Sequence, residues 1–276
     1  MWTGNLRKLT TQPASSVALP IQYQLPLADV TNPSATIPIN EWVGQHITFT
    51  WTGEIHCIET GRKIKKTYGD GLSYPAWLKS PAAVPSVIHP ELSRIHEGIA
   101  LRDEAWEREH HLAPHVVYLS YTGALKVGVT RQTNVPYRWH DQGAVAAILV
   151  AEVPYRQLAG VIEVALKPIF GDKTQWRAML KHQVPATEMM LEAKDEALDA
   201  LDTTYEPFFS EDDAVHSMVY PVSSYPIKVS SVRLEKTGKI EGKLAGIKGQ
   251  YLMFEGGQVI NIRNHIGYRV NIELTK

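Results

Sequence analysis

The middle of the chain holds several side chains whose types suit chemistry at a phosphodiester bond. Five of them lie in a single stretch, namely Tyr118, Lys126, Arg138, His140 and Glu163. An arginine binds a phosphate through two parallel hydrogen bonds, and a carboxylate can hold a metal ion that stabilises the leaving oxygen. A phenol or an imidazole can position or deprotonate the attacking water. We take these five residues as candidate catalytic residues and Glu163 as a candidate ligand for Mg²⁺ or Mn²⁺.

Cationic and aromatic residues accompany this group and suggest a surface for nucleic acid. The candidate nucleic-acid-binding residues are Arg131, Arg138, Trp139, Gln142, Trp176 and Arg177. Aromatic rings stack on bases, and arginine adds charge and cation–π attraction. A structural interpretation stays open for each candidate, because a strand tyrosine commonly packs in a core and Glu163 could simply pair with Arg156.

The elements that must position these residues follow from the local pattern. Residues 115–121 and 124–130 read as two strands joined by the turn Thr122-Gly123, and residues 135–142 as a short helix that ends at Gly143. The apolar run 144–153 predicts a strand buried on both faces. Apolar spacing over 158–169 predicts a helix that ends at Gly171, followed by a short helix over 174–182 and another capped by Thr187. The hairpin would bring Tyr118 and Lys126 to one face, where Gly128 leaves room for a backbone or a phosphate.

This β-β-α-β-α order resembles the core of the GIY-YIG nucleases. The two strand motifs of that family correspond to Val116-Val117-Tyr118 and Lys126-Val127-Gly128, and Val129-Thr130, Arg138 and Glu163 match further motif positions. The resemblance implies that Tyr118 positions or activates water, that Arg138 binds the scissile phosphate and that Glu163 holds Mg²⁺ or Mn²⁺. The chain departs from the pattern at Val116, which replaces a glycine, and at Lys126, which replaces a tyrosine.

The flanking segments are richer in strands. We expect an α+β protein with a β segment at 1–55, a degenerate zinc-knuckle-like and helical connector at 56–114, the GIY-YIG-like module with its following helices at 115–204, and a small β domain at 205–276. In the connector, the charged stretch 101–111 predicts a helix.

The whole chain also resembles an uncharacterised bacterial family, domain of unknown function 2797. The matching stretches include Gly4–Lys8, Thr52–Cys57, Leu125–Arg131, Arg138–Ala144, Lys173–Trp176 and Gly246–Tyr251. Members of that family generally show paired cysteines like those of zinc knuckles. Here Cys57 remains, while the other expected ligand positions hold Thr60, Ser73, Ala76, Ser86 and Ser93, beside a retained His96. Because structural zinc needs four Cys or His ligands, no structural zinc is expected.

Composition sets broader limits on the function. The net charge of −1 gives no general affinity for nucleic acid, so such binding must come from a local patch. No apolar run approaches the roughly 20 residues that span a bilayer, and the first residues lack the apolar stretch of a signal peptide. The single cysteine excludes an intramolecular disulfide. We expect a cytoplasmic protein with no membrane partner.

The leading hypothesis is a GIY-YIG-like, metal-dependent nuclease or nucleic-acid-processing protein that acts on DNA or RNA. A binding module that holds nucleic acid or a nucleotide without cutting it is the first alternative. The second is a protein-interaction scaffold in which the same polar residues complete the core.

Overall fold

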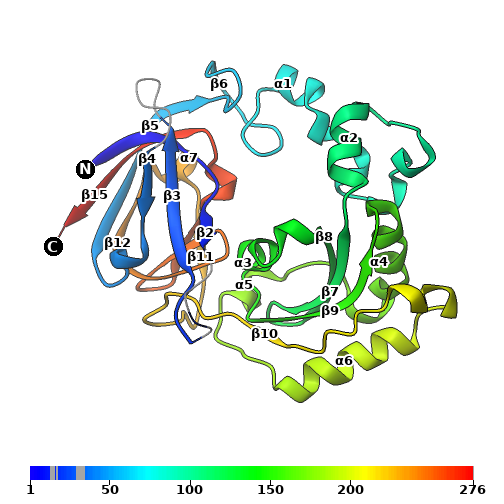
Figure 1. The fold of residues 1–276 in the computed structure, drawn as a ribbon. Helices are drawn as coiled ribbons and strands as arrows, with labels where there is room; N and C mark the ends of the chain where they lie inside the picture. The colour runs from blue at the N-terminus through cyan, green and yellow to red at the C-terminus, as the bar shows by residue number, and fades with distance from the viewer. Residues whose placement is uncertain (13–15, 17, 29–34, 276) are drawn as a thin grey trace. The chain divides into compact units, whose positions relative to one another are not determined.

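The computed structural model describes residues 1–12, 16, 18–28 and 35–275, and its chain divides into two compact units (Figure 1). The first unit combines residues 1–80 with residues 219–276, and the second contains residues 81–218. Each unit has its own sheet, and together they make a mixed α+β protein.

The first unit is an 11-stranded sheet that includes both ends of the described chain. Its main path runs β11-β14-β13-β12-β5-β15-β1-β3-β2, with β4 paired to β3 and β6 paired to β5. The N-terminal strands are β1 (Trp2–Leu6), β2 (Thr10–Gln12), β3 (Gln22–Ala28), β4 (Ala35–Pro38), β5 (His46–His56) and β6 (Lys63–Ile64). The C-terminal strands are β11 (Ser230–Val232), β12 (Lys239–Lys248), β13 (Tyr251–Phe254), β14 (Gln258–Asn261) and β15 (Tyr268–Thr275). Two short helices, α1 (Tyr74–Lys79) and α7 (Leu234–Thr237), belong to this unit.

Pairing between distant strands changes the division expected from the sequence. The long strand β5 pairs with both β12 and β15, and β15 also pairs with β1. Strands from the segment 1–55 therefore share one sheet with the strands of residues 230–275, while β10 (His216–Ser217) of the segment 205–276 belongs to the second unit. Alternation within β5, where Ile47 and Phe49 are buried and His46 and Thr50 are exposed, predicts a half-buried strand but carries no information about which strands will be its neighbours.

The second unit carries a four-stranded sheet in the order β10-β9-β7-β8. Its strands are β7 (His115–Tyr121), β8 (Leu125–Arg131), β9 (Ala146–Val153) and β10 (His216–Ser217). Its helices are α2 (Glu104–His111), α3 (Tyr137–Gln142), α4 (Arg156–Phe170), α5 (Trp176–Met179) and α6 (Thr187–Asp199). One core joins Val117, Leu119 and Val127 of the sheet to Ile162 and Leu166 of α4 and to Met190, Ala193 and Ala197 of α6. Alternation in β7 then directs Tyr118 and Ser120 to the opposite face.

The expected strand, strand, helix, strand, helix order is present in this unit, from β7 to α4. Gly143 and Gly171 follow α3 and α4 with φ angles of 69° and 67°, values that a glycine adopts without steric cost. The expected cap at Thr187 is off by one residue, since α6 begins at Thr187 and Ala186 occupies the cap position. At α2, Asp103 accepts the backbone N–H of Trp106, and the Glu107 carboxylate accepts those of Leu101 and Arg102.

A glycine on α4 allows a neighbouring segment to lie directly on the helix. A methyl group at Gly160 would overlap the backbone N of Glu91, in the single-turn helix η4 (Pro90–Leu92). The close approach of η4 to α4, and not a need for backbone flexibility, therefore explains the glycine in the interior of this helix.

We expect Gly160→Ala to destabilise the protein by about 1–3 kcal/mol, because the added methyl must push η4 away from α4. Helix propensity alone would favour alanine by about 1 kcal/mol, so the two effects have opposite signs. Urea unfolding measures the change, with Val164→Ala, an exposed position on the same helix, as the control. A stabilised Gly160→Ala protein would contradict the close contact.

Candidate functional site

The tyrosine of the first strand lies across the glycine of the second. Tyr118 and Gly128 face each other in the β7–β8 register, and a Cβ built on Gly128 would lie 2.7 Å from the phenol oxygen and 2.8 Å from Cζ. The sequence suggested that Gly128 leaves room for a phosphate. In the structure the Tyr118 ring fills that space, so the glycine is needed for packing within the protein.

The phenol of Tyr118 connects the sheet to α3. Its O–H donates to Oε1 of Gln142 at 3.1 Å, and the oxygen is also hydrogen-bonded with the Arg138 side chain. Arg138 and Gln142 are four residues apart, which places them on the same side of the helix. Complete burial raises the pKa of Tyr118 above its ordinary value of 10, although Arg138 and Gln142 oppose the rise. The phenol therefore remains protonated at neutral pH and acts as a hydrogen-bond donor.

Lys126 lies on the same face of the sheet, opposite Ser120 in the register. Its side chain is 5% exposed. Burial and the nearby Arg138 lower the pKa of Lys126 to about 8, although Glu163 and Asp172 favour its charged form. A neutral amine is therefore available a little above physiological pH, which gives this position the capacity to accept a proton.

Glu163 completes the group from α4. The apolar side of this helix packs on the sheet through Ile162 and Leu166, and Glu163 lies beside that side with 9% exposure. Burial raises its pKa, while Lys167, whose Nζ lies 3.5 Å from Oε2, acts in the opposite direction. The carboxylate thus sits in a partly desolvated place beside a cation.

The structure therefore brings together five residues from four elements, which we call the polar cluster: Tyr118, Lys126, Arg138, Gln142 and Glu163. Four of the five predicted catalytic residues belong to it, and Gln142 was predicted only as a nucleic-acid contact. In Figure 1 the strands, α3 and α4 that carry these residues all lie in the second unit.

The other predicted residues lie elsewhere. The ring of His140 is in edge contact with Tyr137, and burial lowers the pKa of His140 to about 4, so this imidazole is neutral at physiological pH. Trp139 is 1% exposed and packs its ring edge-on to Tyr118 and against His216, so its faces are covered by protein. Its Nε1 has no hydrogen-bond partner among the residues that the structure describes.

The remaining nucleic-acid candidates occupy more open positions. Arg131 is half-buried at the end of β8, where it faces His115 across the pair of strands. On α5, the exposed Arg177 places its guanidinium 4.3 Å from the centre of the Trp176 ring. This pair presents a cation and a half-buried ring on the same short helix.

Three further charged residues surround the polar cluster, and the sequence had indicated only Arg156, as an alternative partner of Glu163. Arg156 interacts electrostatically with Glu163, Lys167 pairs with Glu163, and Asp172 lies 3.7 Å from Lys167. The spacing of Glu163 and Lys167, four residues apart on a predicted helix, was a signal for their pairing. Nothing local in the sequence indicated Asp172, which reaches Lys167 from beyond the helix end at Gly171.

The family comparison covers most of the chain. A family described as "Protein of unknown function (DUF2797)" matches residues 44–270. The chain belongs to this family. No curated protein and no solved structure gives a match.

The positions at which zinc ligands were expected from the family resemblance fall in both units. Cys57 lies in the first unit, where its Sγ accepts the backbone N–H of Ser73 at 3.2 Å and is hydrogen-bonded by Thr60. Burial raises the pKa of this thiol, but the hydrogen bonds from Thr60, Ser73 and Glu59 outweigh it and bring the value to about 7. Ser73 in turn accepts the N–H of Ala76, so the four positions 57, 60, 73 and 76 remain close together.

The remaining positions at which zinc ligands were expected, 86, 93 and 96, belong to the second unit of this DUF2797 chain. Ser93 is hydrogen-bonded with Nδ1 of His111 at 3.2 Å, and Ser86 and His96 each have a buried polar atom without a partner among the described residues. Positions 57, 60, 73 and 76 therefore belong to the first unit, and positions 86, 93 and 96 belong to the second.

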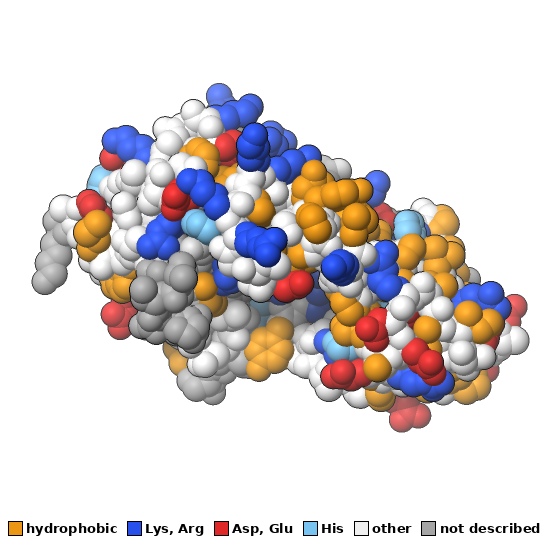
Figure 2. Space-filling view, turned by 90° about the horizontal axis from the view of Figure 1, so that it is seen from above, with side chains coloured by type: hydrophobic (Ala, Val, Ile, Leu, Met, Phe, Trp, Pro, Cys, Tyr) orange, Lys and Arg blue, Asp and Glu red, His pale blue; other side chains and the backbone are white. Residues whose placement is uncertain are grey.

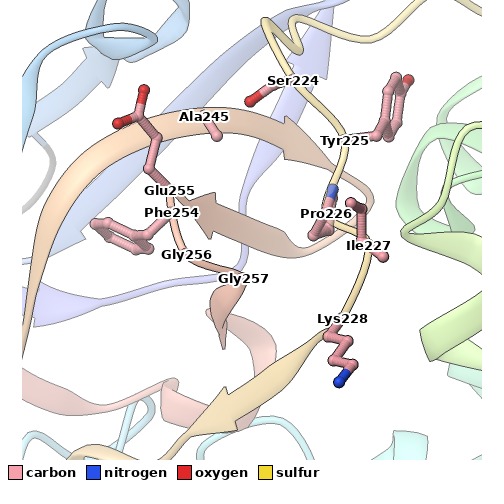
Figure 3. Close-up of a pocket in the computed structure, with 10 residues that line it drawn as sticks. All are labelled: Ser224, Tyr225, Pro226, Ile227, Lys228, Ala245, Phe254, Glu255, Gly256 and Gly257. Carbon is pink, nitrogen blue, oxygen red and sulfur yellow. The ribbon is translucent and has the colours of Figure 1, made fainter.

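A cavity of about 540 Å³ in the first unit contains none of the polar cluster (Figure 3). It is lined by residues 224–228 and by Ala245, Phe254, Glu255, Gly256 and Gly257. Most of these groups are apolar or backbone, and its charged side chains, Lys228 and Glu255, come from different segments. The cavity lacks the set of groups that hydrolytic chemistry needs.

No helix within the described part of the chain is long and apolar enough to cross a membrane. The predicted absence of a membrane partner stays a prediction.

The depressed pKa of Lys126 predicts a pH dependence of stability. The folded protein releases this proton near pH 8, whereas the unfolded chain keeps it up to the ordinary value of 10.5, so between these values the unfolded state binds more protons. The free energy of unfolding should therefore rise with pH in this window, and Lys126→Met should remove on the order of 1–3 kcal/mol of that rise.

Urea unfolding at a series of pH values measures this effect. Lys173→Met, which removes an exposed lysine, is the control for loss of one positive charge. Lys248 also makes the free energy of unfolding rise with pH, because burial lowers its pKa to about 8 as well. This contribution is the same in both variants. An unchanged slope in Lys126→Met would mean that the Lys126 amine keeps its proton in the folded protein.

Proposed function

We propose that the second unit is a GIY-YIG-like module that cleaves phosphodiester bonds in nucleic acid with the help of Mg²⁺ or Mn²⁺. The observation that carries this proposal is the convergence of Tyr118, Lys126, Arg138 and Glu163 into one polar cluster from β7, β8, α3 and α4. The antiparallel sheet with β7 between β8 and β9, and the order of its elements, support the same proposal.

Arg138 is the group that binds the scissile phosphate. It is half-buried and hydrogen-bonded to the Tyr118 phenol, which limits the freedom of its side chain before substrate arrives. A guanidinium held in this way can offer its remaining N–H groups to two phosphate oxygens. Tyr118 and Gln142 act as positioning residues, because the phenol is fully buried and its proton is already donated to Gln142.

Lys126 is the group best suited to take the proton from water. As the water oxygen forms its bond to phosphorus and the bond to the leaving oxygen breaks, the water proton passes to the neutral amine Nζ. The pKa of about 8 supports this role better than the raised pKa of Tyr118 does.

Glu163 is the residue that would hold the metal ion. Among residues 1–12, 16, 18–28 and 35–275, no three His, Cys, Asp or Glu side chains are arranged to hold a metal. A single carboxylate nevertheless fits Mg²⁺, which commonly takes its other ligands from substrate phosphate and water. Bound there, the ion would stabilise charge on the leaving oxygen.

A module that binds nucleic acid without cutting it is the second candidate. The ion pair between Glu163 and Lys167 favours it, because Lys167 already neutralises the carboxylate that would hold the metal. In that case Arg131, Arg138 and Arg177 would give salt-dependent binding that does not change when Glu163 is neutralised.

Cleavage of labelled single-stranded, duplex and branched DNA and RNA, with Mg²⁺ or with Mn²⁺, separates the two candidates. We expect Glu163→Gln to lower the rate by on the order of 100-fold, because the amide keeps the shape but loses the charge that holds the metal. Glu196→Gln, an exposed glutamate on α6, is the matched control and should cleave normally. Equal cleavage by wild type and Glu163→Gln would reject the proposed site, and binding without cleavage by wild type would select the second candidate.

The cleavage rate should also depend on the protonation of Lys126. We expect the rate to rise with pH until about pH 8 and then to level off, as the amine becomes neutral. Lys126→Arg keeps the positive charge but cannot lose its proton near this pH, so it should cleave on the order of 100-fold more slowly without that rise. The same pH profile in wild type and Lys126→Arg would remove Lys126 from the proton transfer.

A further inference from the structure

The segment that carries β6 and α1 has an unusual concentration of positive charge for this chain. Residues 59–80 contain five cations, Arg62, Lys63, Lys65, Lys66 and Lys79, and only two carboxylates, Glu59 and Asp70, in a protein with a net charge of −1. Lys63 pairs with Glu54, and Asp70 pairs with Arg263. In the described part of the chain, the structure gives Arg62, Lys65, Lys66 and Lys79 no carboxylate partner.

Three aromatic rings lie together in the same segment. Tyr74 and Trp77 of α1 stack with ring centres 6.2 Å apart and planes at 25°, and Tyr68 lies 5.0 Å from Tyr74 and 6.3 Å from Trp77. The side chain of Tyr74 is 49% exposed, and its two neighbours are half-buried. The ammonium of Lys66 lies 5.2 Å from the centre of the Tyr68 ring, so charge and rings belong to one surface.

The fold holds this surface in place through several contacts with the sheet of the first unit. Tyr68 and Leu72 exchange backbone hydrogen bonds of 2.8 and 2.9 Å, which closes the loop between them. Gly71, with φ of 97°, packs against Ile58 and Ile266. The Arg263 guanidinium donates hydrogen bonds to both carboxylate oxygens of Asp70, at 3.0 and 2.9 Å. Ser73 caps α1 by accepting the N–H of Ala76. The rings are therefore presented by an anchored loop and helix.

Figure 2 looks down on the side where β6 and α1 lie in Figure 1, and it shows Lys and Arg side chains gathered there. A polar cavity of about 390 Å³ adjoins the loop and is lined by Thr67, Gly69, Asp70, Arg233, Glu235, Arg263, Asn264 and His265. The surface therefore combines one exposed and two half-buried rings with unpaired cations, beside a polar hollow whose two arginines are balanced by two carboxylates.

We propose that Tyr68, Tyr74 and Trp77, with Arg62, Lys65, Lys66 and Lys79, form a binding surface for single-stranded nucleic acid. Partly exposed rings beside unpaired cations match the two parts of such a ligand, since bases stack on the rings and phosphates lie near the cations. A duplex keeps its bases stacked on each other and offers only its phosphates to this surface. This inference rests on the proposed function for the ligand class, nucleic acid, and adds that the bound form is single-stranded. Binding can be measured apart from cleavage.

Binding is measured with the full-length protein and a fluorescein-labelled oligo-dT of about 16 nucleotides, a length that covers one typical single-strand site. EDTA is present throughout, so that metal-dependent cleavage does not interfere. We expect wild type to bind oligo-dT more tightly than a duplex of the same length. The double variant Tyr74→Leu/Trp77→Leu should lose about tenfold in affinity, whereas Trp77→Phe, which keeps a ring, should retain it.

The charged residues are tested separately through the salt dependence of the same binding. Lys65→Ala/Lys66→Ala should lower the slope of log K against log salt by about 1.4, because two phosphate contacts are lost. Lys239→Ala/Lys243→Ala is the matched control, since these two exposed lysines of the same unit are paired with Glu241 and Glu255. Circular dichroism and thermal unfolding establish that each variant is folded, and the lysine variants keep the test valid if Trp77→Leu does not fold.

The results separate this inference from the proposed function. Loss of oligo-dT binding in the ring and Lys65/Lys66 variants, with binding intact in Glu163→Gln, supports the surface whether or not wild type cleaves. Equal affinity for duplex, or unchanged binding in the ring and Lys65/Lys66 variants, would overturn it. Competition by polyglutamate as effective as that by oligo-dT would also overturn it, because it would show a site for any polyanion.

Discussion

The contact between the Tyr118 ring and Gly128 is the constraint on which the polar cluster depends. The Tyr118 ring can lie across the neighbouring strand because Gly128 has no side chain: a Cβ on Gly128 would lie 2.7 Å from the phenol oxygen. With the ring across the glycine, its oxygen reaches Gln142 and Arg138 on α3. The position of the guanidinium thus follows from the absence of one methyl group on the neighbouring strand.

Burial gives the members of the cluster different electrostatic properties. The Tyr118 phenol and the Glu163 carboxyl have raised pKa values and the Lys126 amine a lowered one, and desolvation is the largest cause in all three cases. Desolvation always disfavours the charged form, so it brings the amine and the carboxyl closer to neutral pH and takes the phenol further from it. For this reason we propose Lys126 for proton transfer and Tyr118 for hydrogen bonding.

The charged groups of the two units differ in how deeply they are buried. In the second unit, cations and carboxylates from the sheet and from α3 and α4 are partly buried and interact with one another. In the first unit, the cations of residues 62–79 remain at the surface next to aromatic rings. Groups of the first kind suit chemistry that needs a lowered dielectric, and groups of the second kind suit attraction of a charged polymer.

The sequence alone determined the local elements and most of the residues in the cluster. Strand β7 has the predicted bounds, Gly143 and Gly171 end α3 and α4 as expected, and spacing placed Tyr118 and Lys126 on one face of the hairpin. These features depend on backbone preferences and side-chain alternation over a few neighbouring residues, so the local sequence is enough to predict them.

Tertiary structure decided which distant groups meet. Only the fold pairs β5 with β12 and β15, covers the faces of Trp139 and brings Asp172 to Lys167. A strand pattern specifies which face is buried but not which strand lies next to it, and a ring's accessibility depends on residues far away in sequence. The sequence could therefore name the residues of the cluster, while their burial, and with it their charge states, came from the packing of the whole unit.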